Sequence, residues 1–267
     1  MRTESLTLGY GADAAVVTDL SLEVPAGRVT AVVGPNGSGK STLLRGMSRL
    51  LTPRAGRVVL DGTDVHRLPA KQLARRLGVL PQGPVTPDGI TVAELVSRGR
   101  HPHRGLFARF SAYDEQAVAA ALDAVGMAEY ATRPVQALSG GQRQRVWIAM
   151  VLAQGTPYLL LDEPTTYLDL AHAVDVMEVV HAAARDGGRT VVAVLHDLTL
   201  AARYADHLVV MSGGTVAAEG RPADVLTEDL LADVFGLSAT VVDVGGAPAV
   251  TGQESRCGRA ATGGSWC

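Results

Sequence analysis

The chain has only two cysteines in 267 residues, and it has no apolar run of about 18 residues. Cys257 and Cys267 lie in a terminal stretch rich in Gly, Ser and Ala, which excludes a disulfide framework and a cysteine-based zinc site as organising features. The first thirty residues also lack a basic segment followed by an apolar stretch, so neither a signal peptide nor a membrane-spanning helix is expected. We therefore expect a cytoplasmic protein.

An excess of positive charge is also missing. The formal net charge is −3 at pH 7, so no overall basic field would attract nucleic acid, and nucleic acid is not expected as a partner. Lysine is scarce, because it occurs only at positions 40 and 71 among 24 basic residues. A chain that otherwise uses arginine is expected to keep lysine where a compact point charge is needed.

Short runs of valine and leucine are what the chain has in quantity. Four runs that are apolar on both faces predict buried parallel strands, and they lie at residues 28–34, 158–164, 190–197 and 207–214. Looser alternation with turn residues favours a small antiparallel layer at the edge of that sheet, from residues 4–10, 20–27 and 56–62. The sequence thus predicts an α/β fold.

Strand signals fade between about residues 83 and 155, which indicates a helical lobe inserted between the strands. Within it, Ser111 is a candidate N-cap followed by acidic residues, and Gly126 can end the helix. The expected core of the single domain then comprises residues 1–82 and 156–245. Residues 246–267 are poor in large apolar side chains and are expected to form a flexible tail.

Residues 34–42, GPNGSGKST, match the phosphate-loop pattern G-x-x-x-x-G-K-[ST] between a predicted strand and a predicted helix. Glycines let the backbone N–H groups turn inward, the helix N-terminus adds positive potential, and Lys40 can reach the β- and γ-phosphates. Ser41 is expected to hold Mg²⁺ through its hydroxyl. The expected nucleotide-binding residues here are Gly34, Pro35, Asn36, Gly37, Ser38, Gly39, Lys40, Ser41 and Thr42.

Polar residues follow three of the apolar runs. A buried strand that ends in Asp162 and Glu163 would deliver both acids beside the phosphate loop. Asp162 is expected to hold Mg²⁺ through water, and Glu163 to polarise the water that attacks the γ-phosphate. His196 can bond the γ-phosphate and orient that water, and Gln82 can sense Mg²⁺ and the water. Taken alone, each of these residues could be structural, and the phosphate loop decides between the two readings.

In this order the motifs resemble the nucleotide-binding subunits of ABC transporters over nearly all of residues 3–240. The resemblance implies a P-loop NTPase (RecA-like) core with Walker A at residues 34–42, Walker B at 158–164, Gln82 in the Q-loop and His196 as switch histidine. Tyr10 corresponds to the aromatic residue that stacks on adenine, although a tyrosine there can equally be core. LSGGQ at residues 138–142 corresponds to the signature, and TYLD at 166–169 to a D-loop with an unusual Thr166 and Tyr167.

The resemblance implies that the signature contacts a second nucleotide, which is bound by a partner subunit. The residues expected to meet the γ-phosphate held by a partner subunit are Ser139, Gly140, Gly141 and Gln142, and Asp169 of the D-loop is expected at the same site. The family implies ATP and Mg²⁺ as cofactors and ATP hydrolysis as the activity. It also implies a homodimer at the cytoplasmic face of the membrane, beneath two permease subunits and fed by an extracytoplasmic substrate-binding protein.

Two phrases outside the chemistry, at residues 96–107 and 163–180, resemble the importer subgroup for ferric siderophores, haem and cobalamin. Siderophores are the favoured cargo, and haem and cobalamin stay open. The alternatives are a soluble ABC ATPase, which would need a coiled-coil insertion or a second cassette for DNA or ribosomes, and a P-loop kinase or GTPase, which leaves LSGGQ unexplained. In the basic stretch 98–110 the arginines are expected to meet acidic permease loops or the inner leaflet. His101 and His103 lack a third metal ligand.

Overall fold

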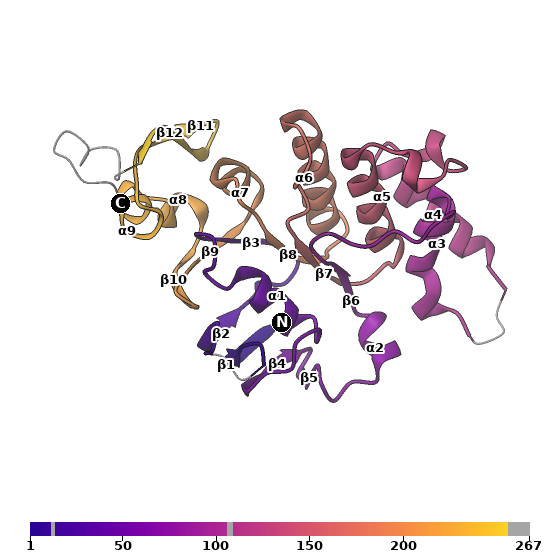
Figure 1. Ribbon diagram of the computed structural model, residues 1–267, viewed down its shortest axis with the longest axis horizontal. Coiled ribbons are helices and arrows are strands. Elements are labelled where there is room, and N and C mark those ends of the chain that lie inside the picture. The colour runs from indigo at the N-terminus through magenta and orange to yellow at the C-terminus, as the bar shows by residue number, and fades with distance from the viewer. Residues whose placement is uncertain (12–13, 106–108, 256–267) are drawn as a thin grey trace.

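The computed structural model describes residues 1–11, 14–105 and 109–255. A sheet of six strands runs through its centre (Figure 1). The strand order is β10-β9-β3-β8-β7-β6, with every neighbouring pair parallel except β9 and β10. The strands are β3 (Val29–Val33), β6 (Leu77–Leu80), β7 (Tyr158–Asp162), β8 (Thr190–Val194), β9 (His207–Ser212) and β10 (Thr215–Gly220). The prediction of an α/β fold with buried parallel strands is confirmed.

Both faces of this sheet are covered, which explains the continuous apolar runs. Every residue of β3 and β8 is buried. Alternate residues face two different cores: Val32 packs with Leu43 and Met47 of α1 (Lys40–Met47), whereas Ala31 and Val33 belong to the core that includes α6 (Leu170–Arg185) and α7 (Leu198–Tyr204). Because successive side chains along a strand point to opposite faces of the sheet, the central sheet contributes to two apolar layers, one on each face.

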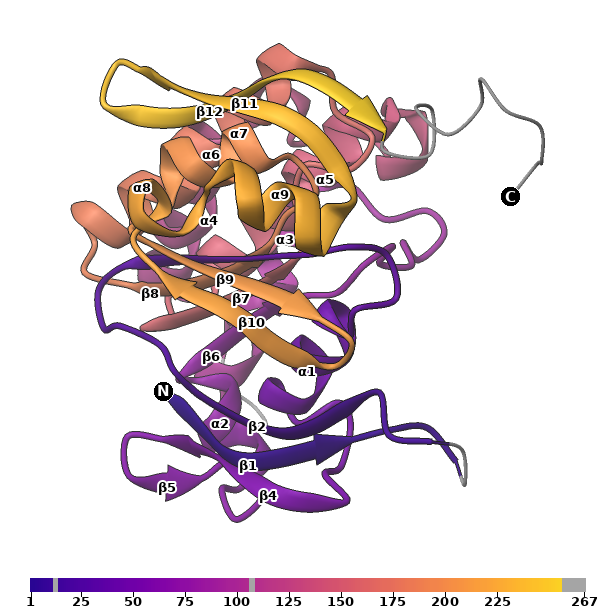
Figure 2. The ribbon, with the colours of Figure 1, turned by 90° about the vertical axis from the view of Figure 1, so that its left-hand side faces the viewer.

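The predicted antiparallel layer is confirmed, and it forms a separate sheet. Its order is β2-β1-β4-β5, from β1 (Arg2–Leu8), β2 (Val17–Glu23), β4 (Ala55–Leu60) and β5 (Thr63–Asp64). In Figure 2 this sheet lies below α1, and the central sheet lies above it. Leu6 and Leu8 of β1 pack with Leu43 of α1, so the small sheet holds the helix that follows the phosphate loop.

The segment expected to be a helical lobe contains helices and no named strand within its described residues. After α2 (Ala70–Ala74) and β6 come α3 (Val92–Ser97), the 3₁₀ turns η1 (Arg98–His103), η2 (Ala128–Tyr130) and η3 (Val135–Ala137), and the helices α4 (Ala112–Ala124) and α5 (Gly140–Ala153). Ser111 caps α4 as predicted, in a capping box with Asp114, and Gly126 follows the helix with φ +63°. The division at residues 82 and 155 stays a prediction.

The expectation of a flexible tail from residue 246 is wrong for residues 247–255. These residues form β12 (Ala247–Ser255), which pairs antiparallel with β11 (Leu237–Val244) after α8 (Pro222–Val225) and α9 (Glu228–Phe235). The hairpin lies over α7 in Figure 2, and Val250 is buried in the main core. Pairing and packing order a segment whose composition is too polar to predict it. Residues 256–267, with both cysteines, lie outside the described residues.

Membrane-spanning helices are not part of this architecture: none of the helices in the described ranges combines the length and the apolar character needed to cross a bilayer.

Candidate functional site

The phosphate loop joins the buried end of β3 to the start of α1, as the sequence predicts. Gly34, Gly37 and Gly39 have φ values of +150°, +78° and +99°, which side-chain-bearing residues rarely adopt. A Cβ on Gly34 would overlap the carbonyl oxygen of Met211, and a Cβ on Gly39 would lie 3.1 Å from Val17 Cγ2. The path of the loop between β9 and the small sheet therefore depends on these glycines.

The Lys40 side chain folds back over this loop. Its Nζ donates hydrogen bonds to the carbonyl oxygens of Gly34 and Pro35, both at 2.8 Å. Burial lowers the pKa of Lys40, and the negative charges of Glu163 and Asp162 partly oppose that shift. The ammonium group thus lies inside the loop with two carboxylates nearby, which suits a group that meets phosphate oxygens.

Ser41 and Asp162 meet although 120 residues separate them in sequence. Ser41 Oγ donates a hydrogen bond of 2.9 Å to Asp162 Oδ1. Burial raises the pKa of Asp162, the charge of Glu163 raises it further, and the bond from Ser41 opposes the shift. The described residues include no group of three His, Cys, Asp or Glu side chains that could hold a metal. A hydroxyl with one carboxylate nevertheless fits Mg²⁺, which is usually bound through one or two protein oxygens, substrate phosphates and waters.

Glu163 lies at the centre of a cluster that three strand ends bring together. One carboxylate oxygen, Oε1, is 2.7 Å from His196 Nε2, and the other accepts a 3.0 Å hydrogen bond from Thr166 Oγ1. Burial acts to raise the pKa of Glu163, but hydrogen bonds from His196, Thr166 and Gln82 together outweigh it, so the pKa lies below its usual value. The carboxylate is therefore ionised near neutral pH and able to accept a hydrogen bond from water.

The cluster brings Glu163, His196 and Gln82 together, as expected from their places after β7, β8 and β6. Thr166 is a contact that the sequence did not indicate, because its only signal is that it lies three residues after Glu163. The backbone explains the geometry: Glu163 has φ +54°, and Thr166 N donates to Glu163 O at 3.3 Å. A tight turn therefore returns the Thr166 hydroxyl to the carboxylate.

Tyr10 lies beside α1, where it was expected to meet the adenine ring. Its hydroxyl is 3.2 Å from Thr42 Oγ1 and accepts a 3.3 Å hydrogen bond from Arg45. The side chain is anchored at the hydroxyl end, yet the residue keeps 40% of its surface exposed. An exposed ring next to the phosphate loop suits stacking and excludes the alternative that Tyr10 is a core residue.

The signature residues form the start of α5. Ser139 is the N-cap, and it shares a capping box with Gln142, whose N–H donates to Ser139 Oγ at 3.2 Å. No acidic residue occupies the first turn, so the helix N-terminus keeps its positive potential. The signature and the D-loop together line a cavity of about 310 Å³, whose lining residues are Ser139, Gly140, Gly141, Gln142, Arg145, Tyr167, Leu168, Asp169 and His172.

Asp169 caps α6 from within this cavity. Its Oδ1 accepts from His172 N at 2.9 Å and lies 2.8 Å from His172 Nδ1. None of residues 34–42, all of which the structure describes, lines the cavity. Within one chain, the signature and the phosphate loop therefore face different spaces.

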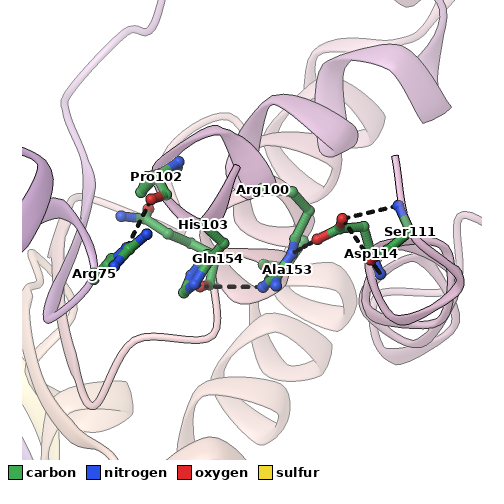
Figure 3. A network of polar contacts seen from close by, with 8 residues as sticks. All are labelled: Arg75, Arg100, Pro102, His103, Ser111, Asp114, Ala153 and Gln154. Carbon is green, nitrogen blue, oxygen red and sulfur yellow. Dashed lines mark hydrogen bonds and ion pairs between the residues drawn. The ribbon is translucent and has the colours of Figure 1, made fainter. Parts of the chain in front are cut away.

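The basic stretch after α3 differs from its expectation. Arg100 does not point outward: it is 3% exposed, and its Nε lies 2.8 Å from Asp114 Oδ1 in a buried ion pair (Figure 3). His103 Nε2 lies 2.7 Å from Gln154 O, while His101 is exposed. Residues 106–108 lie outside the described ranges. The prediction that the arginines meet a membrane partner is thus wrong for Arg100, because α4 supplies a carboxylate within the lobe.

In sequence and in fold, the chain is similar to ATP-binding proteins of ABC transporters. The ABC transporter family model matches residues 17–166. The chain is 50% identical over 252 residues to the ferric enterobactin transport ATP-binding protein FepC of Escherichia coli K12, covering 94% of this chain and 93% of that protein. It is 49% identical over 242 residues to the iron(3+)-hydroxamate import ATP-binding protein FhuC of Bacillus subtilis 168, covering 91% and 90%. A dimeric bacterial ABC transporter cassette superposes with a TM-score of 0.75 at 27% identity, covering 82% of this chain and 97% of that one.

Proposed function

Because the chain belongs to the ABC transporter family and is one of its ATPases, we propose that it energises the uptake of an iron(III)-siderophore chelate through partner permeases. The cargo is inferred from the two relatives, whose names specify ferric enterobactin transport and iron(3+)-hydroxamate import. The observation that carries the mechanism is the cluster of Glu163, His196 and Gln82 beside the pair formed by Ser41 and Asp162.

The site residues divide the reaction between binding and water activation. The loop N–H groups and Lys40 bind the phosphates, and Tyr10 stacks on the adenine ring. Ser41 and Asp162 would hold Mg²⁺, with Gln82 nearby, and the ion would supply positive charge that offsets the negative charge of the phosphates. Glu163 accepts a hydrogen bond from the attacking water, and His196 orients that carboxylate and the γ-phosphate. The water oxygen bonds to the γ-phosphorus as the bond to the leaving oxygen breaks, a water proton passes to the Glu163 carboxylate, and ADP and phosphate result.

A homodimer explains why the signature cavity lies apart from the phosphate loop. Ser139, Gly140 and Gly141 would meet the γ-phosphate bound by the partner subunit, so that each chain supplies half of two sites. Tyr167 and Leu170 beside this cavity are 81% and 70% exposed, as expected of apolar side chains that another subunit covers. The dimeric relative supports this arrangement.

The remaining partners follow from the importer proposal. Two integral-membrane permease subunits would bind this dimer at the cytoplasmic face of the membrane. A substrate-binding protein on the other side would deliver the chelate. ATP-driven closure of the dimer would then move the permease, and hydrolysis would release it.

The variant Glu163→Gln tests the mechanism. We expect it to bind ATP normally, to lose nearly all hydrolysis, and to accumulate as an ATP-bound dimer, because the amide cannot accept the proton of the attacking water. Equilibrium titration, phosphate release and size-exclusion chromatography measure these properties. Glu129→Gln, a change of an exposed glutamate outside the motifs, is the matched control. Unchanged turnover in Glu163→Gln would remove Glu163 from this role.

Uptake assays test the cargo. A strain that lacks this subunit is supplied separately with radiolabelled ferric hydroxamate, ferric catecholate, haem and cobalamin. We expect loss of uptake for a ferric siderophore and its return when the chain is restored, but not when Glu163→Gln is supplied. Loss of haem or cobalamin uptake alone would contradict the siderophore proposal.

A further inference from the structure

Gln144 of α5 reaches the turn that carries Glu163. Its side-chain Nε2 donates a 3.1 Å hydrogen bond to Pro164 O and lies 3.5 Å from Glu163 O. The turn is under conformational strain, because Glu163 is a non-glycine residue with φ +54°. Surrounding contacts must hold such a backbone, and the Gln144 amide is the contact that α5 makes with its carbonyl oxygens.

The first turns of α5 touch the same segment at a second point. A Cβ on Gly141 would lie 3.0 Å from Leu168 Cδ2 of the D-loop. Gly141 and Gln144 are three residues apart and so lie on one face of the helix. The face that begins at the signature therefore packs along residues 163–168, polar at one end and apolar at the other.

We infer that Gln144 is a positioning residue that connects the two ATP sites of the dimer. This inference rests on the proposed function, in which Ser139 and Gly141 engage the nucleotide of the partner while Glu163 acts on the nucleotide of its own chain. When α5 engages the partner's γ-phosphate, Gln144 transmits the position of α5 to the carbonyl groups of Glu163 and Pro164. Gln144 itself touches neither nucleotide. Hydrolysis at one site thereby depends on the occupation of the other.

The variant Gln144→Met tests this connection, because methionine matches the length of glutamine and lacks the donor. With the full chain and Mg-ATP, we expect kcat to fall about three- to tenfold, the range given by the loss of one neutral hydrogen bond. The half-saturating ATP concentration should stay within about twofold of the unmodified protein, and the Hill coefficient should fall toward one. Gln136→Met is the matched control, since Gln136 Nε2 also donates to a proline carbonyl, that of Pro87, at 3.0 Å.

Mixed dimers separate positioning within one chain from damage to the signature. One subunit carries Glu163→Gln, so only the site that uses the other subunit's Glu163 turns over. Gln144→Met in the subunit with intact Glu163 should lower turnover, whereas the same change in the Glu163→Gln subunit should leave turnover within about twofold. A variant that only distorts the signature would give the reverse pattern, because each signature serves the opposite site.

The reverse pattern, equal losses in both arrangements, or no loss in either would overturn the inference. If Gln144→Met does not yield folded protein, Gln144→Glu takes its place, since it keeps the shape and sets a carboxylate against the carbonyl oxygens. Failure of the proposed function is distinguishable: the unmodified chain would then show no ATP-dependent turnover or would stay monomeric with ATP. Cooperative turnover in the unmodified chain and in Gln144→Met alike would contradict this inference alone.

Discussion

Replacing Arg100 by methionine should strongly destabilise the protein. The Arg100 and Asp114 side chains are only 4% and 8% exposed, and their 2.8 Å ion pair joins η1 to the first turn of α4. Arg100 Nη1 also donates to Ala153 O at 2.8 Å near the end of α5 (Figure 3). In Arg100→Met the Asp114 carboxylate stays buried, with Ser111 as its remaining partner.

The expected loss is about 3 to 5 kcal/mol in the free energy of unfolding, because removal of one partner leaves a buried charge without its counterion. Urea unfolding of the full chain, followed by circular dichroism, measures it. The double variant Arg100→Met/Asp114→Asn should recover part of the loss, since it removes the orphaned charge. A loss below about 1 kcal/mol, or strictly additive effects in the double-mutant cycle, would refute the reasoning.

The ion pair of Arg100 and Asp114 makes the free energy of unfolding depend on pH. Hydrogen bonds from Arg100 and from Ser111 lower the pKa of Asp114 to about 2. Because this lies below the unfolded value of about 3.9, the stabilisation is complete above pH ~4 and is lost as the pH falls toward 2. In Arg100→Met this loss should shrink or reverse, because protonation relieves the unpaired carboxylate. The free energy of unfolding of the unmodified protein and of Arg100→Met, measured between pH ~2 and ~7, tests this. Identical pH profiles for the two proteins would contradict the pairing of Asp114 with Arg100.

Four further changes, two substitutions and two truncations, test other parts of the structure. Lys40→Ala should raise the dissociation constant for ATP at least tenfold, about the 1.4 kcal/mol of a charge-assisted bond, and normal binding by calorimetry would contradict the phosphate assignment. Ser139→Arg should leave ATP binding by the monomer intact but block dimer formation and hydrolysis; a dimer by size exclusion would count against the signature's role. Truncation after Gly245 removes buried Val250 and should lower Tm by several degrees while ATPase activity at 25 °C is retained. Truncation after Ser255 should leave Tm unchanged, and equal effects would show that β12 adds no stability.

The parts that the sequence predicts well are those whose cause is local. The strand β3 is apolar on both faces because both faces are buried, so its burial is visible in five consecutive residues. The phosphate loop needs glycines for its backbone and a lysine for its charge, which leaves a fixed spacing. Ser111 caps α4 through its own side chain, and the acids that favour the helix N-terminus follow directly.

The parts that the sequence misses depend on distant partners. Nothing in the stretch around Arg100 indicates burial, because its counterion arrives on another helix. β12 contains Pro248 and several polar residues, and its order comes from pairing with β11 and packing against the core. Gln144 follows the signature as one polar residue among several, and only the fold brings it to Glu163. In each case tertiary contact overrides local composition.

The strand order also determines when the protein can fold during its synthesis. β3 leaves the ribosome early, yet Val29 lies opposite Val191 of β8 and Thr30 opposite His207 of β9. At roughly 5 to 20 residues per second, this largely apolar strand waits about 10 to 30 s for its first neighbour. The nascent chain therefore carries an unpaired, aggregation-prone edge through most of translation. A pause in translation before β8 is made would prolong the time for which β3 is unpaired.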